Sequence, residues 1–303
     1  MAISRQQLVK ELEPGLNALF GLEYKRYDQE HKEIYVTESS DRAFEEEVML
    51  SGFANAYVKP EGSAVAYDNA QETFTARYTN ETVALAFALT EEAMEDNLYD
   101  RLASRYTKAL ARSMANAKQI KAAVPLNQGL PTTDNYDSGD GVSLFTTNHP
   151  CIGPVFSNTL TTQSDLNETS LEQALIDIAA MTDERGLKIA AKGVKMIVPS
   201  ANQFTAERLM KSQGRVGTAD NDINAVKSMG MIPQGYRVNN YLTDTDSWYI
   251  MTDVPNGMKH FDRAPLTTKM EGDFDTGNVR YKARARYVFG VSDPRGIFGV
   301  EGA

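Results

Sequence analysis

The stretch from Thr90 to Pro125 constrains the fold most, because it has the pattern of one long amphipathic helix. Its first turns carry acids and its later turns carry bases, an order that complements the helix dipole. Apolar residues recur at every fourth position from Met94 to Met114. Roughly 30 residues at a rise of 1.5 Å span about 45 Å. We therefore expect a single spine helix that runs through an entire domain, begins at a Thr90 cap and ends at Pro125.

The residues before this helix predict an exposed β-hairpin. Residues 53–58 and 72–89 alternate between apolar and polar residues, as strands do. The residues between them are rich in turn formers and hold few large apolar groups. An isolated hairpin is only marginally stable in water, so this one should rest on a neighbouring molecule.

The N-terminal region carries a weaker signal. Residues 3–12 predict a short amphipathic helix that ends at Pro14–Gly15. Residues 21–47 are polar and charged, with no sustained period. This segment is either a flexible arm or one that becomes ordered by lying across another surface.

The second half of the chain predicts an α/β unit followed by long strands. The expected elements are a loop-rich passage at 126–165, a helix at 168–185, a strand at 193–199, a helix from a Ser200 capping box to 212, and strands at 236–242, 247–252, 265–271 and 278–290. In the last strand Lys282, Arg284 and Arg286 alternate with small or aromatic residues, so one side should pack inward. The turn at Asp293–Gly296 then lets Ile297 and Phe298 pack back onto the domain.

Composition excludes several classes of protein. The chain has 303 residues, which favours two compact units or one with long excursions. Its 41 acidic and 31 basic residues leave a formal charge of -10, so its average surface repels nucleic acid and anionic membranes. It has one cysteine and no apolar run long enough for a signal peptide or a membrane span. We expect a soluble protein made in the cytoplasm.

Few residues suggest chemistry. His149 lies two positions before Cys151, but a thiol nucleophile needs an imidazole beside it in space, so a half-buried thiol and a loop histidine are favoured. The acidic loops at 134–141 and 218–222 lack the terminal glutamate of a calcium loop. Lys59 could form a covalent link to Asn278 of a neighbouring chain, but the favoured interpretation is an ordinary solvated lysine. We expect no enzyme activity, no cofactor and no metal.

Three stretches carry a family resemblance. "FALTEEAMEDNLYDRLASRYTKALARS" resembles the segment that joins the extended loop to the spine helix in the major capsid proteins of tailed bacteriophages. "LFTTNHPCIGPVFSN" and "RARYVFGVSDPRGIFG" resemble the loop before the apical domain and the closing strand of the same family, and they follow in the right order. Encapsulins share this shell fold. The resemblance covers about residues 40–303.

The resemblance implies an α+β fold, the tailed-phage major capsid protein fold. The implied parts are an N-terminal arm at 1–49, an extended β-hairpin loop at 50–89, a peripheral domain made of the spine helix at 90–125 and C-terminal strands at 255–303, and an apical α/β domain at 126–254. It also implies hexamers and pentamers that form an icosahedral virion shell around double-stranded DNA, without sequence-specific binding. Assembly would take place in the cytoplasm of the host bacterium, with a portal protein as partner.

The residues alone do not determine which scaffolding or decoration proteins act on the shell. The short arm lacks a long, charged helical extension, so any scaffolding protein should be a separate chain; a decoration protein is a further open partner. The closest alternative is an encapsulin-like compartment shell, and a more distant one is a Cys151/His149 thiol hydrolase.

Charged residues are the candidate contacts between subunits. Acids of the arm would pair with bases of the helix and the last strand, because charge complementarity fixes register between partners. The candidates are Glu45, Glu46, Glu47, Lys59, Arg77, Arg101, Arg105, Arg284 and Arg286.

Overall fold

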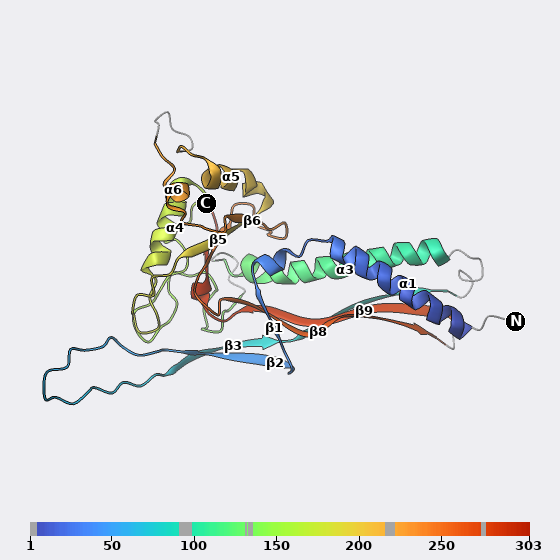
Figure 1. Cartoon of the computed structure of the whole chain (residues 1–303), viewed down its shortest axis with the longest axis horizontal. Coiled ribbons are helices and arrows are strands. Elements are labelled where there is room, and N and C mark those ends of the chain that lie inside the picture. Colours follow the sequence, from blue (N-terminus) through green and yellow to red (C-terminus); the bar gives the residue numbers. More distant parts are fainter. Residues whose placement is uncertain (1–4, 91–98, 131, 133–135, 216–221, 274–276) are drawn as a thin grey trace.

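The chain has an elongated part, a compact unit at one end and a loop that projects away from both (Figure 1). A computed structural model describes residues 5–90, 99–130, 132, 136–215, 222–273 and 277–303. Helices and several separate sheets make the fold α+β, as predicted.

The helices are α1 (Arg5–Arg26), α3 (Tyr99–Gln128), α4 (Glu168–Ala180), α5 (Gln203–Lys211) and α6 (Ala225–Met229), with 3-10 turns η1 (Glu30–Glu33), η2 (Ser200–Asn202) and η3 (Pro294–Gly296). The strands are β1 (Val36–Ser39), β2 (Phe44–Leu50), β3 (Glu72–Thr79), β4 (Glu81–Leu89), β5 (Gly193–Val198), β6 (Tyr236–Val238), β7 (Trp248–Thr252), β8 (Met258–Gly272), β9 (Val279–Val291) and β10 (Ile297–Val300).

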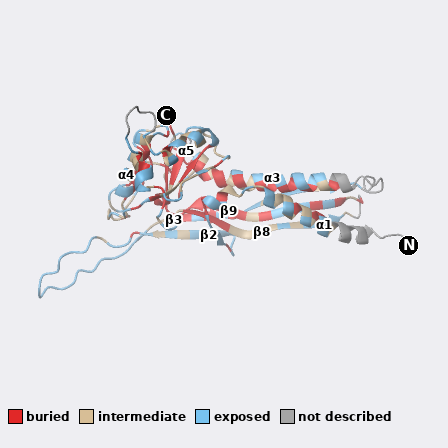
Figure 2. Cartoon of the chain, turned by 45° about the horizontal axis from the view of Figure 1, so that its top comes forward, coloured by how far each residue is buried: buried red, intermediate tan, exposed pale blue. Residues whose placement is uncertain are grey.

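One sheet runs along the elongated part, with the strand order β1-β8-β9-β4. β9 pairs with both β8 and β4 in antiparallel register, whereas β1 lies parallel to β8. Helices α1 and α3 contact each other and lie together along this sheet (Figure 1). Residues of both layers form one hydrophobic cluster, which includes Leu110, Met114, Ala283, Ala285 and Tyr287. The core of the elongated part is therefore a helix layer packed on one face of a sheet (Figure 2).

The end of the chain follows the sequence-based expectation. On β9, Lys282 and Arg284 are exposed and alternate with the buried positions of that strand. After the turn at Asp293–Gly296, Ile297 and Phe298 are fully buried. The predicted alternation and the predicted packing of the last strand are both confirmed.

Helix α1 continues through Pro14, so the predicted helix end at Pro14–Gly15 is wrong. Proline inside a helix removes a backbone hydrogen bond and costs about 3 kcal/mol. Leu16 and Phe20 lie about one turn apart on the buried side of α1, and their burial in the cluster shared with α3 offsets that cost. The following residues contact α3 through η1 and pair with β8 through β1. Of the two alternatives for residues 21–47, ordering across another surface is confirmed, and that surface belongs to the same chain.

Helix α3 is the predicted spine helix, with 30 residues. The predicted start at Thr90 adjoins residues 91–98, which lie outside the described residues. The predicted end at Pro125 is wrong, because the helix continues to Gln128 and the Pro125 carbonyl accepts a bond of 3.1 Å from the Gly129 N–H. A proline has no N–H to donate, but its carbonyl can still accept the bond of the next turn.

The buried side of α3 does not follow a strict spacing of four. Tyr106, which belongs to the predicted stripe, is 48% exposed, whereas its neighbour Thr107 is buried. A helix repeats every 3.6 residues, so positions four apart rotate gradually off the buried face.

The predicted hairpin is divided between two sheets. β2 pairs with β3 in a two-stranded ribbon, and the predicted strand at 53–58 is wrong because those residues form no strand ladder. Residues 72–89 are not one strand, since β4 pairs with β9 instead. Asn80 marks the crossing: its side-chain amide donates to Ser40 Oγ at 2.7 Å and to the Arg42 carbonyl at 3.0 Å. These bonds fix the point at which the chain leaves the ribbon.

The compact unit is built on a second sheet with the order β10-β7-β5-β6, surrounded by α4, α5 and α6 (Figure 1). Asn167 and Ser170 form a capping box at the start of α4, which ends at Ala180, earlier than predicted. The predicted capping box at Ser200 is wrong, because Ser200 lies in η2 and makes no cap bond there. The helix that follows it is confirmed as α5.

Two glycines let the C-terminal turn touch the start of β8. A Cβ added at Gly296 would lie 2.3 Å from the Gly257 Cα, and one added at Gly257 would lie 2.8 Å from the Gly296 Cα. Backbone can approach backbone this closely only where neither residue has a side chain.

We predict that Gly296→Ala destabilises the fold by about 2–3 kcal/mol, because backbone must move to admit the methyl group. Gly15→Ala is the matched control: nothing lies within 4 Å of its added Cβ, and alanine favours the interior of α1. It should stabilise by about 0.5–1 kcal/mol. Urea unfolding of both variants measures the difference; equal effects of the same sign would contradict the close-approach explanation.

Candidate assembly surfaces

The extended loop, residues 51–71, is the most exposed part of the chain (Figure 2). Every residue in it except Ser51 and Ala54 is exposed. Its exposed apolar residues are Phe53, Tyr57, Val58, Val65 and Tyr67. Tyr67 is 98% exposed and Val58 95%. Apolar side chains gathered on a segment without a core make the extended loop a candidate contact surface.

A few polar contacts attach the extended loop to the body. Arg185 donates from Nη2 to the Asn69 carbonyl at 2.6 Å and lies 3.8 Å from an oxygen of Asp68. Asp68 also accepts a bond of 2.7 Å from the Ala54 N–H, which joins the two limbs of the loop, and backbone bonds of this kind lower the pKa of Asp68. The loop is therefore held near its base and not at its tip.

The base of the loop is packed firmly onto the sheet. Tyr78 of β3 meets Phe261 of β8 with ring centroids 4.8 Å apart, on the face opposite the helices. Glu47 of β2 accepts a hydrogen bond from Ser292 and pairs with Lys259. Burial lowers the pKa of Lys259, but hydrogen bonds and charge from its two carboxylate partners outweigh burial, so the net shift is upward.

The three predicted contact acids have different surroundings. Glu45 accepts a bond of 2.8 Å from Ser40 Oγ, and Glu47 belongs to the base just described. Glu46 faces outward across from Arg77, with N–O at 3.7 Å and both side chains about half exposed. An exposed pair at this distance contributes little to stability. Glu46 is therefore the member of the three that is most accessible to another chain.

The predicted contact bases do not form one patch. Arg284 and Arg286 lie on the β9 positions that face away from the buried cluster, and Arg286 is half-buried. Arg105 is exposed on α3, which covers the other face of the sheet. The side chain of Arg101 lies outside the described residues. Contacts between these residues and another subunit stay a prediction.

Lys59 and Asn278 lie in regions far apart in the chain. Lys59 is exposed in the extended loop, which projects from one end of the molecule, whereas Asn278 precedes β9 at the opposite end (Figure 1). Any Lys59–Asn278 bond would therefore join two chains.

His149 and Cys151 do not form a catalytic pair. His149 is fully buried, with Nδ1 2.6 Å from Asp140 Oδ2 and Nε2 3.0 Å from Asn158 Oδ1, so both ring nitrogens are engaged. The Cys151 thiol instead lies 3.4 Å from Arg295 Nη2. Burial, then the charge of nearby Glu184, raises the pKa of the thiol to about 11, which keeps it protonated and weakly nucleophilic. The structure gives the thiol-hydrolase alternative no support.

Arg295 is the centre of a buried ionic cluster that the sequence pattern did not reveal. Its guanidinium bonds Glu184 at 2.7 Å and Asp293 at 3.3 Å, and its Nε donates to the Thr182 carbonyl at 2.7 Å. The same group lies 3.9 Å from the ring centroid of Phe156. Burial raises the pKa of Asp293 in spite of the arginine. The cluster joins the C-terminal turn to two loops of the compact unit.

The acidic loop around Asp137 uses its carboxylates internally. Asp137 accepts from the Gly139 N–H at 2.7 Å and from the Gly141 N–H at 3.1 Å, while Asp140 bonds Ser138 and His149. Most of the second acidic loop, at 218–221, lies outside the described residues. In the described part of the chain, no three histidine, cysteine, aspartate or glutamate side chains gather as a metal site.

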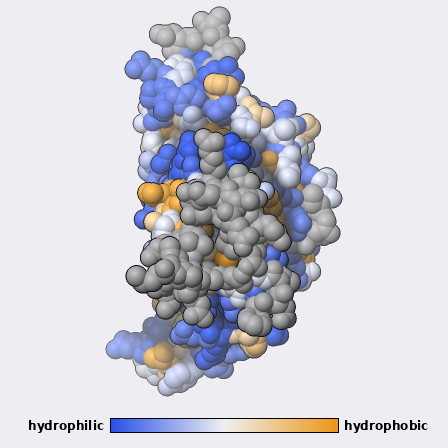
Figure 3. Space-filling model, turned by 90° about the vertical axis from the view of Figure 1, so that its right-hand side faces the viewer, coloured by the Kyte–Doolittle hydropathy of each residue, from blue (hydrophilic) through white to orange (hydrophobic). Residues whose placement is uncertain are grey.

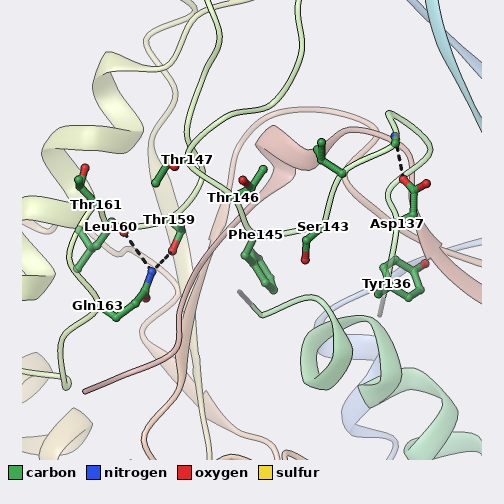
Figure 4. Close-up of a pocket in the computed structure, with 12 residues that line it drawn as sticks. Tyr136, Asp137, Ser143, Phe145, Thr146, Thr147, Thr159, Leu160, Thr161 and Gln163 are labelled. Carbon is green, nitrogen blue, oxygen red and sulfur yellow. Dashed lines mark hydrogen bonds between the residues drawn. The ribbon is translucent and has the colours of Figure 1, made fainter. Parts of the chain in front are cut away.

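A cleft of about 760 Å³ opens beside this loop (Figure 4). Hydroxyl groups dominate its lining, which includes Ser143, Thr146, Thr147, Thr159 and Thr161. The side-chain amide of Gln163 donates to Thr159 Oγ1 at 3.1 Å and to the Leu160 carbonyl at 3.1 Å, so its nitrogen is already bonded to two groups of the lining. The lining thus offers neutral polar groups, and its one carboxylate, Asp137, is held by backbone N–H groups.

Seen along its long axis, the described part of the N-terminal end shows hydrophobic groups scattered among hydrophilic ones (Figure 3). No described helix combines the length and the apolar composition needed to cross a bilayer.

Comparison with known proteins identifies the family. A family model described as phage capsid protein matches residues 72–300. The chain belongs to the phage capsid protein family. It is a structural, major capsid protein and a component of a virion shell built from copies of itself. No curated protein matches this capsid protein.

Solved capsids share its fold at low sequence identity. The capsid of an empty GTA particle aligns with a TM-score of 0.59 and 14% identity, over 90% of this chain and 89% of that one. The capsid of Myoviridae phage XM1 aligns at 0.54 and 11%, over 89% of each chain. A virus-like particle from Pyrococcus furiosus aligns at 0.52 and 10%, over 94% of this chain and 98% of that one. At such identities the likeness shows the fold alone.

We predict that Arg295→Met destabilises the capsid protein by about 3–5 kcal/mol, because Glu184 and Asp293 would stay buried without their cation. Cys151→Ala should cost about 1 kcal/mol or less, since it removes one half-buried atom. Urea unfolding of the two variants provides the comparison. An equal cost for both would show that the cluster does not depend on the guanidinium.

Proposed function

We propose that this capsid protein is the major head subunit of a tailed phage, and that it assembles as hexamers and pentamers into an icosahedral shell around double-stranded DNA. The observation that carries the proposal is the extended loop: it exposes apolar side chains and its base is fixed, whereas its exposed tip bonds within itself, from Ser63 to the Pro60 carbonyl. A second copy is the surface that such a loop fits, because shell subunits repeat the same contact with each neighbour.

The sheet face without helices supplies a second contact. Lys269 of β8 lies directly opposite Lys282 of β9, and Arg284 and Arg286 follow on the same face. We call these four residues the basic strip. Like charges directly opposite on neighbouring strands are destabilising, and among the described residues none of the four has a carboxylate within ion-pair distance. A strip of this kind fits acidic side chains of another copy.

The net charge of -10 makes acids the abundant partners for this strip. Glu46 is the acid of the arm that we assign to it, because it is exposed and its pair with Arg77 is long and solvated. Glu45 and Glu47 are less exposed and have closer partners in their own chain. The same net charge limits adhesion of the inner surface to packaged DNA.

The remaining partners follow from the same proposal. A portal protein closes one vertex, and a separate scaffolding protein and a decoration protein are further candidates. Assembly takes place in the cytoplasm of the host bacterium. The proposed parts are the N-terminal arm at 1–49, the extended loop at 50–89, the spine helix at 90–125, the apical domain at 126–254 and the C-terminal strands at 255–303. Pairing of β4 with β9 argues for ending the loop region near Asn80.

A compartment shell without a genome is the second candidate, because the virus-like particle noted above has the same fold. The two candidates differ in their contents: nucleic acid for the phage head, cargo proteins for the compartment.

We predict that the expressed protein forms closed shells, visible by electron microscopy. Replacing residues 53–69 by a short glycine linker should leave a folded subunit that cannot form these shells. The deletion retains β2 and β3, whose packing on the sheet supports the fold. Circular dichroism establishes folding of the variant. Persistently monomeric wild-type protein, even with scaffold and at high concentration, would refute the function; shells from the variant would refute the role of the loop.

We also predict that Lys282→Glu combined with Arg284→Glu reduces assembly at least about tenfold at low salt, because acids would then face acids across the contact. Reversal of two other exposed lysines, Lys188→Glu with Lys192→Glu, is the matched control and should assemble normally. Light scattering during assembly measures both. Normal assembly of the strip variant would show that these bases do not contact a neighbour.

A further inference from the structure

Two buried histidines attach the segment between α1 and β2 to the rest of the chain. His31 of η1 is 2% exposed and His260 of β8 is 1% exposed. Their rings meet edge to face with centroids 5.6 Å apart. Both rings also contact Phe289 of β9, which stacks on His260 at 4.4 Å. The pair therefore lies where η1, β8 and β9 converge.

Hydrogen bonds from α3 set the protonation state of His31. Gln119 Oε1 accepts from the backbone N–H of His31 at 3.1 Å, which fixes which end of the amide is the oxygen. Its Nε2 donates to the Asp28 carbonyl at 3.2 Å and faces His31 Nδ1 at 3.0 Å. Nδ1 must accept that bond, so the ring is neutral. A proton on Nδ1 would set two donors against each other.

His260 is equally unsuited to a second proton. Its Nδ1 lies 3.1 Å from Thr37 Oγ1 of β1, the strand that follows η1. Its Nε2 is buried and has no hydrogen-bond partner among the described residues. A protonated ring would carry an N–H donor on each nitrogen, and the donor on Nε2 would be buried without an acceptor.

The charged groups around the pair favour neutral rings. Lys118 of α3 lies with Nζ 4.9 Å from the ring centroid of Tyr287 on β9, and Lys32 lies beside His31 on η1. Burial first, and then the charge of Lys118, lowers the pKa of His31 to about 4 and that of His260 to about 3.

The other titratable groups near the pair do not offset the lysines. The charge of Asp262 on β8 raises the pKa of Lys118. Burial lowers that pKa by more, so the net shift is downward. Tyr24 of α1, Tyr35 after η1 and Tyr287 of β9 have pKa values raised by burial, so they are uncharged at neutral and acidic pH.

We propose that His31 and His260 form an acid-released latch, which holds residues 28–39 against α3 and the sheet at neutral pH and lets them go when either ring is protonated. Opening also breaks the bond of 2.6 Å from the Tyr35 hydroxyl to the Ala122 carbonyl and uncovers that part of α3. The latch goes beyond the proposed function, because it is a property of one chain and operates whether or not a shell forms.

The direction of the pH dependence follows from the depressed pKa values. An unconstrained histidine titrates near pH 6.5, so the two rings bind protons at a higher pH in the released state than in the closed state. The closed state is therefore fully favoured above about pH 6.5 and loses its advantage as the pH falls toward about 4.

Hydrogen exchange of the full-length chain, followed by mass spectrometry and corrected for the intrinsic pH dependence of exchange, tests the latch. Peptides covering residues 30–39 should lose protection at least about tenfold between about pH 6.5 and pH 4. Strands β5 and β7, which contain no histidine, should retain theirs and serve as the internal reference. Sedimentation at each pH records the assembly state separately.

Two variants separate the latch from general acid denaturation. Gln119→Glu places a carboxylate beside His31, which accepts a hydrogen bond from the protonated ring and so stabilises it in the closed state. The pH at which the segment is released should therefore fall by about one unit. Gln128→Glu, the same change at an exposed site on the same helix, should behave as wild type. His31→Gln with His260→Gln removes both titrating groups and should abolish the transition; should it fail to fold, the Gln119→Glu shift decides. Release at the wild-type pH in Gln119→Glu, or loss of protection in β5 and β7 together with 30–39, would overturn the proposal.

Discussion

The antiparallel ladder between β8 and β9 is the constraint on which the rest of the structure depends. Successive residues of a strand point to opposite faces, so one face of the ladder carries the core beneath α1 and α3 while the other carries Tyr78 of β3 and the basic strip. A register slip of one residue would exchange these two faces. The same ladder therefore determines where the helices pack, where the loop is anchored and which charges face outward.

The anchoring of the extended loop follows from that ladder. Glu47, Lys259 and Ser292 join β2 to the ends of β8 and β9, so the direction of the loop is set by the body of the chain. Beyond its base the loop buries almost nothing, and its apolar residues remain exposed. Stability is thus concentrated in the sheet and the helix layer, and the exposed loop is the surface that we propose for contact with other copies.

Local signals in the sequence predicted the elements better than their connections. The spine helix, the alternation of β9 and the packing of Ile297 depend on periodicity and turn chemistry, which the sequence carries directly. The passage of α1 through Pro14 and the division of residues 72–89 at Asn80 depend on tertiary burial and on side-chain bonds to distant residues, which no local pattern contains. For the candidate surfaces, the sequence indicated charge but not partners: Glu45 and Glu47 bond groups of their own chain, and Arg295 is buried in an ionic cluster.

A cryo-electron microscopy map of the assembled particle tests the central claim most directly. The account predicts density for residues 53–67 lying against a neighbouring copy, with the apolar side chains of the loop buried there and an acidic side chain of another copy beside Arg284. A closed particle in which the loop folds back onto its own chain, with the basic strip open to solvent, would contradict it.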